Sequence, residues 1–193
     1  MNRICVFCGS NPGARPEYVE AARRMGVAMV QRALGLVYGG GRVGLMGAIA
    51  DAVLAEGGSV IGVIPKGLAD REVAHTGLPD LRVVGSMHER KATMVSLADA
   101  FIAMPGGFGT LEEFHEVVTW AQLGIHGKPC GLLNVEGYYD PLLALFDHGV
   151  AEGFILPAYR SLVIAERDEY RLLDLLASYR APAVTKWIDR DET

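Results

Sequence analysis

The sequence contains few cysteines and no long apolar run, and each shortage excludes a class of protein. Its three cysteines, Cys5, Cys8 and Cys130, cannot pair evenly. Cys5 and Cys8 are three residues apart in a strand-like run, which points them to opposite faces and away from a shared metal. We therefore expect three buried thiols. No apolar run approaches the roughly 18–20 residues of a membrane span, so a membrane protein is not expected.

Positive charge is also in short supply. The chain has 18 lysines and arginines against 23 acidic residues, a net charge of −5. A general nucleic-acid binder would carry a basic surface, so this class is not expected. The first residues, MNRICVFCGS, enter a strand pattern at once, which predicts a cytoplasmic protein without a signal peptide.

Short apolar runs alternate with helical patterns along the whole chain. Near-continuous apolarity is typical of strands covered on both faces. The alternation predicts an α/β fold with a single doubly wound, mostly parallel, Rossmann-like sheet of about seven strands and helices on both faces. We expect one domain over 1–180, a least regular stretch over 66–80, and a C-terminal tail over 181–193. The predicted strands are 4–10, 35–40, 59–65, 81–85, 100–106, 129–135 and 160–166.

Glycine-rich turns follow three of these strands, at the ends where open parallel sheets bind ligands. They contain Gly9 and Ser10, then Gly39-Gly40-Gly41, then the loop that begins at Pro105. Residues 39–44 match GxGxxG, but the next strand ends in Ile-Pro-Lys without the acid that would hold an NAD ribose. This motif is either a tight turn or a phosphate contact. Gly9, Ser10, Gly40 and Gly41 are thus candidate nucleotide contacts.

Two cations near one predicted helix start also need an explanation. Ser86 and Glu89 form a capping box, so Glu89 is most simply structural. Arg90 and Lys91 follow directly, where positive charge opposes the helix dipole by about 0.3–1 kcal/mol each. They also border the apolar face of the helix. Either they form salt bridges with a neighbour, or they bind a ligand.

The stretch PGGFGTLEE at 105–113 raises the same alternative more sharply. Gly106, Gly107 and Gly109 allow backbone N–H groups to face an anion beside a helix start. Thr110 and Glu113 form a second potential capping box, which would explain Glu113 structurally. However, Glu113 lies at the border of the buried stripe, and Glu112 repels Glu116 one turn along. Catalysis and capping both remain open on spacing alone.

Several other chemistries have no support in the sequence. No HxxxH pattern predicts a metal site, and no GxSxG elbow predicts a serine hydrolase. The glycine loop lacks the Lys-Ser/Thr ending of a P-loop. Only four lysines are present, none in a recognisable setting for pyridoxal phosphate. We expect neither a metal nor a cofactor.

Taken together, four motifs resemble the LONELY GUY (LOG) family of cytokinin-activating phosphoribohydrolases, long mislabelled as lysine decarboxylases. The motifs are YGGGRVGLMG (38–47), REVAHTGL (71–78), SMHERKATM (86–94) and PGGFGTLEE (105–113). The resemblance implies hydrolysis of the N-glycosidic bond of N6-substituted adenosine 5′-monophosphates or AMP. It also implies a homodimer with sites near the subunit interface.

The resemblance assigns roles to residues in these motifs. It makes Arg90 and Glu113 the catalytic pair. The alternative reading is a non-catalytic nucleotide or molybdenum-cofactor carrier on the same fold, which would not need both residues. The substrate contacts that the resemblance and the glycine loop imply are Glu72, Arg90, Lys91, Gly106, Gly107, Phe108, Gly109, Thr110, Leu111, Glu112, Glu113 and Thr119.

Overall fold

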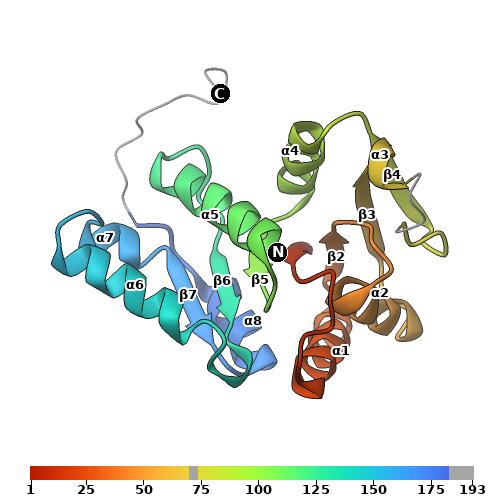
Figure 1. The fold of residues 1–193 in the computed structure, drawn as a ribbon, viewed down its shortest axis with the longest axis horizontal. Coiled ribbons are helices and arrows are strands. Elements are labelled where there is room, and N and C mark those ends of the chain that lie inside the picture. Colours follow the sequence, from red (N-terminus) through yellow and green to blue (C-terminus); the bar gives the residue numbers. More distant parts are fainter. Residues whose placement is uncertain (70–73, 183–193) are drawn as a thin grey trace.

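The computed structural model describes residues 1–69 and 74–182 and contains a seven-stranded, fully parallel sheet (Figure 1). The strand order is β4-β3-β2-β1-β5-β6-β7, which confirms the predicted doubly wound arrangement. The strands are β1 (Arg3–Phe7), β2 (Gly35–Tyr38), β3 (Val60–Pro65), β4 (Asp80–Val84), β5 (Ala100–Ala103), β6 (Cys130–Leu133) and β7 (Val163–Glu166).

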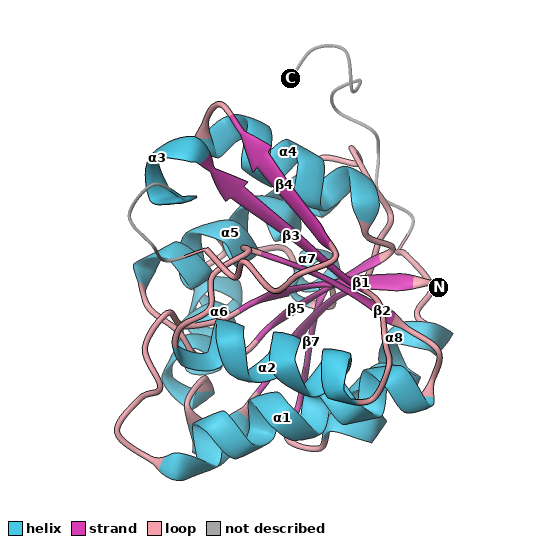
Figure 2. Ribbon diagram, turned by 90° about the vertical axis from the view of Figure 1, so that its right-hand side faces the viewer, coloured by secondary structure: helices cyan, strands magenta, loops and turns pink. Residues whose placement is uncertain are grey.

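Helices cover both faces of the sheet (Figure 2). On one face, α1 (Pro16–Gln31), α2 (Gly44–Ala55) and α8 (Glu169–Ser178) contribute to one apolar core. On the other, α4 (Met87–Leu97), α5 (Phe108–Gln122) and α6 (Asp140–Ala151) pack over a second core. Three short elements lie between them: α3 (Lys66–Leu68), η2 (Val135–Gly137) and α7 (Pro157–Arg160). Burial on both faces is why the inner strands β1, β2, β3, β5 and β6 are nearly continuously apolar, whereas the edge strand β4 exposes Arg82 and Val83.

The chain direction around the sheet reverses at β1, and this reversal positions the site. From β1 the chain winds outward through β2 to β4 and then returns to β5 on the other side. The loops after β1 and β5 therefore diverge and leave a crevice at the carboxyl ends of the strands. The amide of Gly9 donates to the carbonyl of Pro105 at 3.0 Å, which joins the two loops.

The cysteines lie where the strand pattern predicts. All three are buried, free thiols. Cys5 belongs to the core beneath α4 and α5, and Cys8 to the core beneath α1 and α2, so the two face opposite sides of the sheet. Their spacing therefore reflects the strand pleat and not a metal site.

The predicted strands are all present, but several are shorter than predicted. Several strands end one to three residues early, because the glycines that follow turn the chain out of the sheet. Before β4, the described part of the least regular stretch, 66–80, contains the short α3 and an isolated bridge at Ala74. Of the predicted tail, only 181 and 182 lie within the described residues. The single domain over 1–180 stays a prediction.

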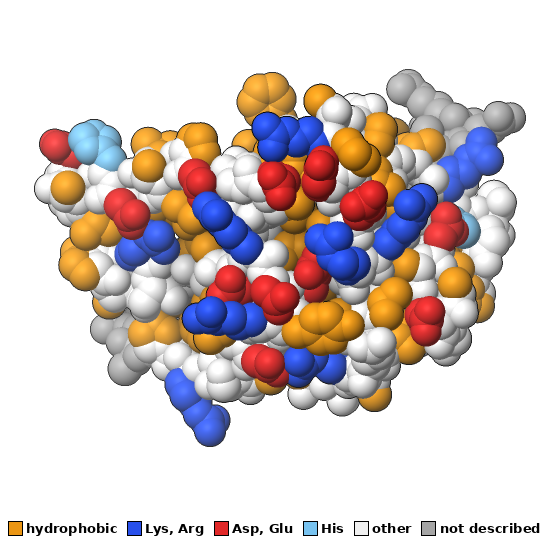
Figure 3. All heavy atoms as spheres, turned by 90° about the horizontal axis from the view of Figure 1, so that it is seen from below, with side chains coloured by type: hydrophobic (Ala, Val, Ile, Leu, Met, Phe, Trp, Pro, Cys, Tyr) orange, Lys and Arg blue, Asp and Glu red, His pale blue; other side chains and the backbone are white. Residues whose placement is uncertain are grey.

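The described surface mixes both signs of charge. On the face in Figure 3, acidic and basic side chains alternate over most of the drawn area. Within the described ranges, no helix is both long and apolar enough to cross a bilayer.

Candidate active site

A buried ion pair joins α4 to α5 at the carboxyl end of the sheet. Nη1 of Arg90 lies 2.7 Å from Oε1 of Glu113. Nε of Arg90 also donates to the carbonyl of Val63 in β3 at 3.1 Å. The two side chains are only 11% and 10% exposed. The structure thus brings together the two residues that the family resemblance names as a catalytic pair.

The start of α4 aims Arg90 into this position. Oγ of Ser86 accepts a hydrogen bond from the amide of Glu89 at 3.1 Å, as a capping box predicts. The Glu89 carboxylate accepts from the amide of Gly85 at 2.7 Å, one residue before the expected partner. With the first turn fixed in this way, the next residue, Arg90, faces the ends of β2 and β3.

The second capping box is wrong. Helix α5 begins at Phe108, its N-cap is Gly107, and no side chain caps it. Glu113 therefore lies about one and a half turns inside the helix, and its carboxylate contacts Arg90 instead of a helix amide. The physical reason is that the glycines let the chain enter the helix three residues earlier than a threonine cap would.

Burial and the neighbouring arginine act on Glu113 in opposite directions. Burial raises the pKa of Glu113, and the charge and hydrogen bond of Arg90 lower it. The net direction is upward, since burial is the larger cause. Burial removes solvation from the carboxylate, and the interaction with one arginine does not compensate for the whole loss. A further positive charge beside this carboxylate would therefore be strongly stabilised.

The crowding of carboxylates on α5 is relieved by Lys91. Its Nζ lies 2.5 Å from Oε1 of Glu112 and 2.9 Å from Oε1 of Glu116. Burial lowers the pKa of Lys91, but the hydrogen bonds to these two carboxylates outweigh it and leave the pKa raised. Lys91 thus forms the salt bridges of the structural alternative and ties α4 to α5 one residue after Arg90.

A cavity of about 360 Å³ opens beside the Arg90–Glu113 pair. Its walls come from the ends of β1 and β2 and from α2, α3, α4 and the start of α5. It is lined by Val6, Phe7, Cys8, Gly9, Ser10, Gly39, Met46, Leu68, Arg90, Gly107, Phe108, Gly109, Thr110 and Glu113. Segments predicted separately from sequence therefore meet at one place.

The start of α5 forms an open rim of this cavity. A Cβ built on Gly107 or Gly109 would meet nothing within 4 Å, so the backbone is accessible there. Phe108 is 93% exposed beside it. The first N–H groups of a helix have no partner within the helix, and the helix dipole adds positive potential. This rim can therefore hold an anion such as a phosphate.

Some predicted contacts lie elsewhere. Gly40 and Gly41 are not among the residues lining the cavity. The carbonyl of Gly40 accepts from the amide of His75 at 2.8 Å, and Gly41 pairs with Ala74 in an antiparallel bridge. This part of the motif is therefore a tight turn that holds a loop.

Leu111, Glu112 and Thr119, three further contacts implied by the resemblance, do not line the cavity of this chain. Leu111 packs toward the core beneath α5, and Glu112 binds Lys91 at the surface. Thr119 is exposed, about 240° around the helix from Glu113 at roughly 100° per residue. Glu72 lies outside the described residues.

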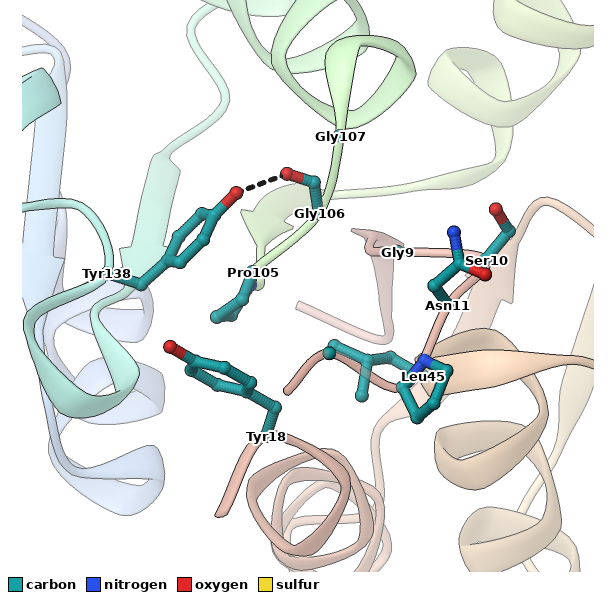
Figure 4. Close-up of a pocket in the computed structure, with 11 residues that line it drawn as sticks. Gly9, Ser10, Asn11, Tyr18, Leu45, Pro105, Gly106, Gly107 and Tyr138 are labelled. Atoms are coloured by element: carbon teal, nitrogen blue, oxygen red, sulfur yellow. Dashed lines mark hydrogen bonds between the residues drawn. The ribbon is translucent and has the colours of Figure 1, made fainter. Parts of the chain in front are cut away.

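A second cavity of about 190 Å³ adjoins the first (Figure 4). The two share Gly9, Ser10 and Gly107, and Gly106 lines the second. Tyr138 and Tyr18 meet edge to face on its far side, with ring centroids 5.9 Å apart. The hydroxyl of Tyr138 donates to the carbonyl of Gly106 at 2.5 Å.

Several of these residues are not predicted from the sequence. Tyr138 fixes the glycine loop from 32 positions away, and no motif marks it. Met46 and Leu68 also line the main cavity. Met46 lies within the YGGGRVGLMG motif, so extending the site to the whole motif would have found it.

Comparisons with known proteins identify the family to which this chain belongs. The family model described as "Possible lysine decarboxylase" matches residues 46–176, more than half of the chain. A cytokinin riboside 5′-monophosphate phosphoribohydrolase of Arabidopsis thaliana is 53% identical over 93% of this chain and 82% of its own length. The namesake enzyme LOG of Oryza sativa subsp. japonica is 53% identical over 93% of this chain and 74% of its own.

The chain belongs to the LOG family. Two solved structures share the fold of this LOG protein at low identity. A molybdenum cofactor binding protein of Rippkaea orientalis has a TM-score of 0.70 at 21% identity, covering 92% of this chain and 96% of its own. The molybdenum cofactor carrier protein of Chlamydomonas reinhardtii has a TM-score of 0.69 at 18% identity, covering 92% and 99%. These two likenesses concern the fold alone.

The lysine decarboxylase description of the family model does not fit the cavity of this LOG protein. None of the described residues lining the cavity is a lysine. The nearest one in sequence to the pair, Lys91, is bound by two carboxylates of α5. A Schiff-base lysine needs a free, deprotonated amine, and the raised pKa of Lys91 works against that.

Proposed function

We propose that this LOG protein hydrolyses the N-glycosidic bond of adenosine 5′-monophosphates, N6-substituted or plain, and releases free base and ribose 5-phosphate. It would act as an N-glycosidase-type hydrolase. The observation that carries the proposal is the buried Arg90–Glu113 pair, which faces the same cavity as the open start of α5. An anion site and a buried carboxylate in one cavity match the two ends of a phosphorylated nucleoside.

The chemistry follows from the charges. When the bond from C1′ to the purine nitrogen breaks, its electron pair leaves with the base and the sugar takes on oxocarbenium character. The Glu113 carboxylate, poorly solvated in the cavity wall, stabilises that positive charge. Water then adds to C1′ and gives up a proton, with Glu113 placed to orient or accept from it. The base takes a proton as it departs.

Arg90 and the loop have separate tasks. Arg90 favours the ionised form of Glu113 against the larger effect of burial, and it orients the carboxylate by donating from Nη1 while its Nε is anchored on the carbonyl of Val63. The amides at Gly107, Phe108, Gly109 and Thr110 hold the 5′-phosphate. The loop after β1, with Gly9 and Ser10, closes the other side of the crevice. Apolar Leu68 and Met46 are placed to contact the base.

We also propose that the protein acts as a cytoplasmic homodimer. Two apolar side chains that line the cavity are exposed: Phe108 is 93% exposed and Leu68 39%. Thr119, a ligand contact by family resemblance, faces away from the cavity of its own chain. A second copy would cover this region and bring Thr119 to a ligand. Sedimentation equilibrium measures the mass, and a monomer at micromolar concentration would contradict the proposal.

The decisive experiment is a substrate panel. AMP, N6-isopentenyladenosine monophosphate, adenosine and ADP are incubated with the protein, and free base and ribose 5-phosphate are quantified by chromatography. We expect equal amounts of both products from the monophosphates. Adenosine should react far more slowly, because it lacks the anion for the α5 rim. Nucleotide binding without any base release would support the carrier alternative instead.

A further inference from the structure

Gly39, the first glycine of the turn after β2, lies directly against Arg90. A Cβ built on Gly39 would lie 3.3 Å from Cζ of Arg90, and nearer to Nη2 than the 3.0 Å below which real Cβ atoms are essentially never found. Gly39 is not one of the glycines with positive φ, whereas its neighbour Gly40 has φ +72°. A side chain at position 39 would therefore collide first with the guanidinium of Arg90, while the backbone conformation itself does not require glycine.

The guanidinium of Arg90 is thus fixed on three sides. Nε donates to Val63, Nη1 donates to Glu113, and Nη2 lies over the bare backbone of Gly39. We propose that Gly39 is a positioning residue for the hydrolysis: because it has no side chain, the guanidinium reaches its place beside Glu113. This inference rests on the proposed function, since it assigns Gly39 a part in the same reaction.

A methyl group at position 39 would displace the guanidinium. To regain ordinary contact distances, the guanidinium must retreat by about 1 Å, and Arg90 then cannot keep both of its hydrogen bonds at their present lengths. Glu113 would lose its fixed partner or follow it out of position. Since the backbone amides that hold a phosphate lie on α5, nucleotide binding should change much less than turnover.

A purely structural glycine predicts a different outcome. Such a glycine would lower stability on substitution by the same amount whether or not Arg90 is present, and it would leave turnover per folded molecule unchanged. The two readings separate in a double-mutant cycle. Once Arg90 is truncated, the nearest remaining atom to the new methyl is Sδ of Met46 at 3.4 Å, an ordinary contact.

The experiment compares Gly39→Ala, Arg90→Ala and the double variant. Gly131→Ala serves as the matched control: Gly131 is a buried strand glycine, and the atoms nearest to its added Cβ belong to the side chains of Leu172 and Leu176. Base release from the preferred monophosphate gives kcat and KM, and calorimetry gives Tm. For Gly39→Ala we expect kcat to fall roughly 10- to 100-fold with KM within about threefold. Gly131→Ala should lower Tm and keep kcat.

The cycle in Tm decides the interpretation. Gly39→Ala should lower Tm when Arg90 is present and have little effect when position 90 is alanine. An equal loss of Tm in both backgrounds, or a normal kcat in Gly39→Ala, would overturn the inference. If Gly39→Ala alone does not fold, a folded double variant supports the inference and an unfolded one refutes it. Normal turnover in Arg90→Ala would instead contradict the proposed function itself.

Discussion

The replacement Glu113→Gln isolates the charge on which the proposed mechanism depends. Glutamine has nearly the shape of glutamate and keeps an oxygen that can accept from Nη1 of Arg90, now 2.7 Å away. The substitution therefore removes a negative charge and little else. The anion rim at the start of α5 is untouched, so nucleotide binding should persist.

The size of the effect follows from burial and distance. The side chain of Glu113 is 10% exposed, so an effective dielectric constant near 20 is more appropriate than that of water. A full positive charge about 4 Å from the carboxylate then gains about 4 kcal/mol. The sugar carries only part of a charge, and Arg90 offsets some of the field, which leaves about 3 kcal/mol. At 1.36 kcal/mol for each tenfold change, kcat should fall by roughly 100- to 1,000-fold.

The assay measures base release by chromatography under single-turnover conditions, alongside nucleotide binding by equilibrium dialysis. Glu169→Gln is the matched control, because Glu169 is also a buried carboxylate, 7% exposed and 2.9 Å from Arg24, but on the opposite face of the sheet. It should change Tm and leave kcat alone. Turnover by Glu113→Gln within about threefold of the parent would refute the electrostatic reasoning.

Three further predictions follow from the same contacts. The acid limb of kcat/KM should have its midpoint above pH 4.5, because burial raises the pKa of Glu113, and a midpoint at or below 4.5 would contradict the buried pair. The contribution of Glu113 to stability has the opposite pH dependence: it is complete below the unfolded pKa and is lost as the pH rises through the raised folded value. Tyr138→Phe removes the 2.5 Å hydrogen bond to the Gly106 carbonyl and should lower the free energy of unfolding in urea by about 1 kcal/mol and weaken nucleotide binding. Unchanged binding would show that this hydrogen bond does not support the anion site at the start of α5. Asp99 accepts hydrogen bonds from the amides of Asn2 and Arg3 at 2.6 and 3.1 Å, which lowers its pKa. Asp99→Asn should therefore lower the free energy of unfolding at pH 7, and the difference from the parent should vanish on acidification through that lowered pKa. A difference that does not change with pH would show that the charge is not its cause.

The sequence pattern was sufficient for the architecture. Seven mostly apolar runs, each bounded by turn residues and separated by helical periodicity, specify the strands of a parallel sheet covered by helices, because each signal is local. The placement of the glycine turns at one edge also follows, since parallel strands all present their carboxyl ends there. Because side chains alternate faces along a strand, Cys5 and Cys8 could also be assigned to opposite faces from their spacing alone.

Local signals failed where two of them competed. Thr110 and Glu113 have the spacing of a capping box, yet the helix begins at Phe108 and Glu113 contacts Arg90. Likewise Arg90 and Lys91 look equivalent in sequence. In the fold, Arg90 lines the cavity, whereas Lys91 forms salt bridges with two carboxylates of α5.

The sequence by itself determined the sheet, the positions of its glycine turns and the family. The tertiary structure alone decided which side chains meet. Arg90 reaches Glu113 across 23 positions, Tyr138 reaches Gly106 across 32, and Gly39 makes room for an arginine 51 positions away in sequence. Periodicity and turn chemistry are properties of neighbouring residues. Contacts between elements depend on how closely the strands and helices pack, and this distance is set only when the whole core forms.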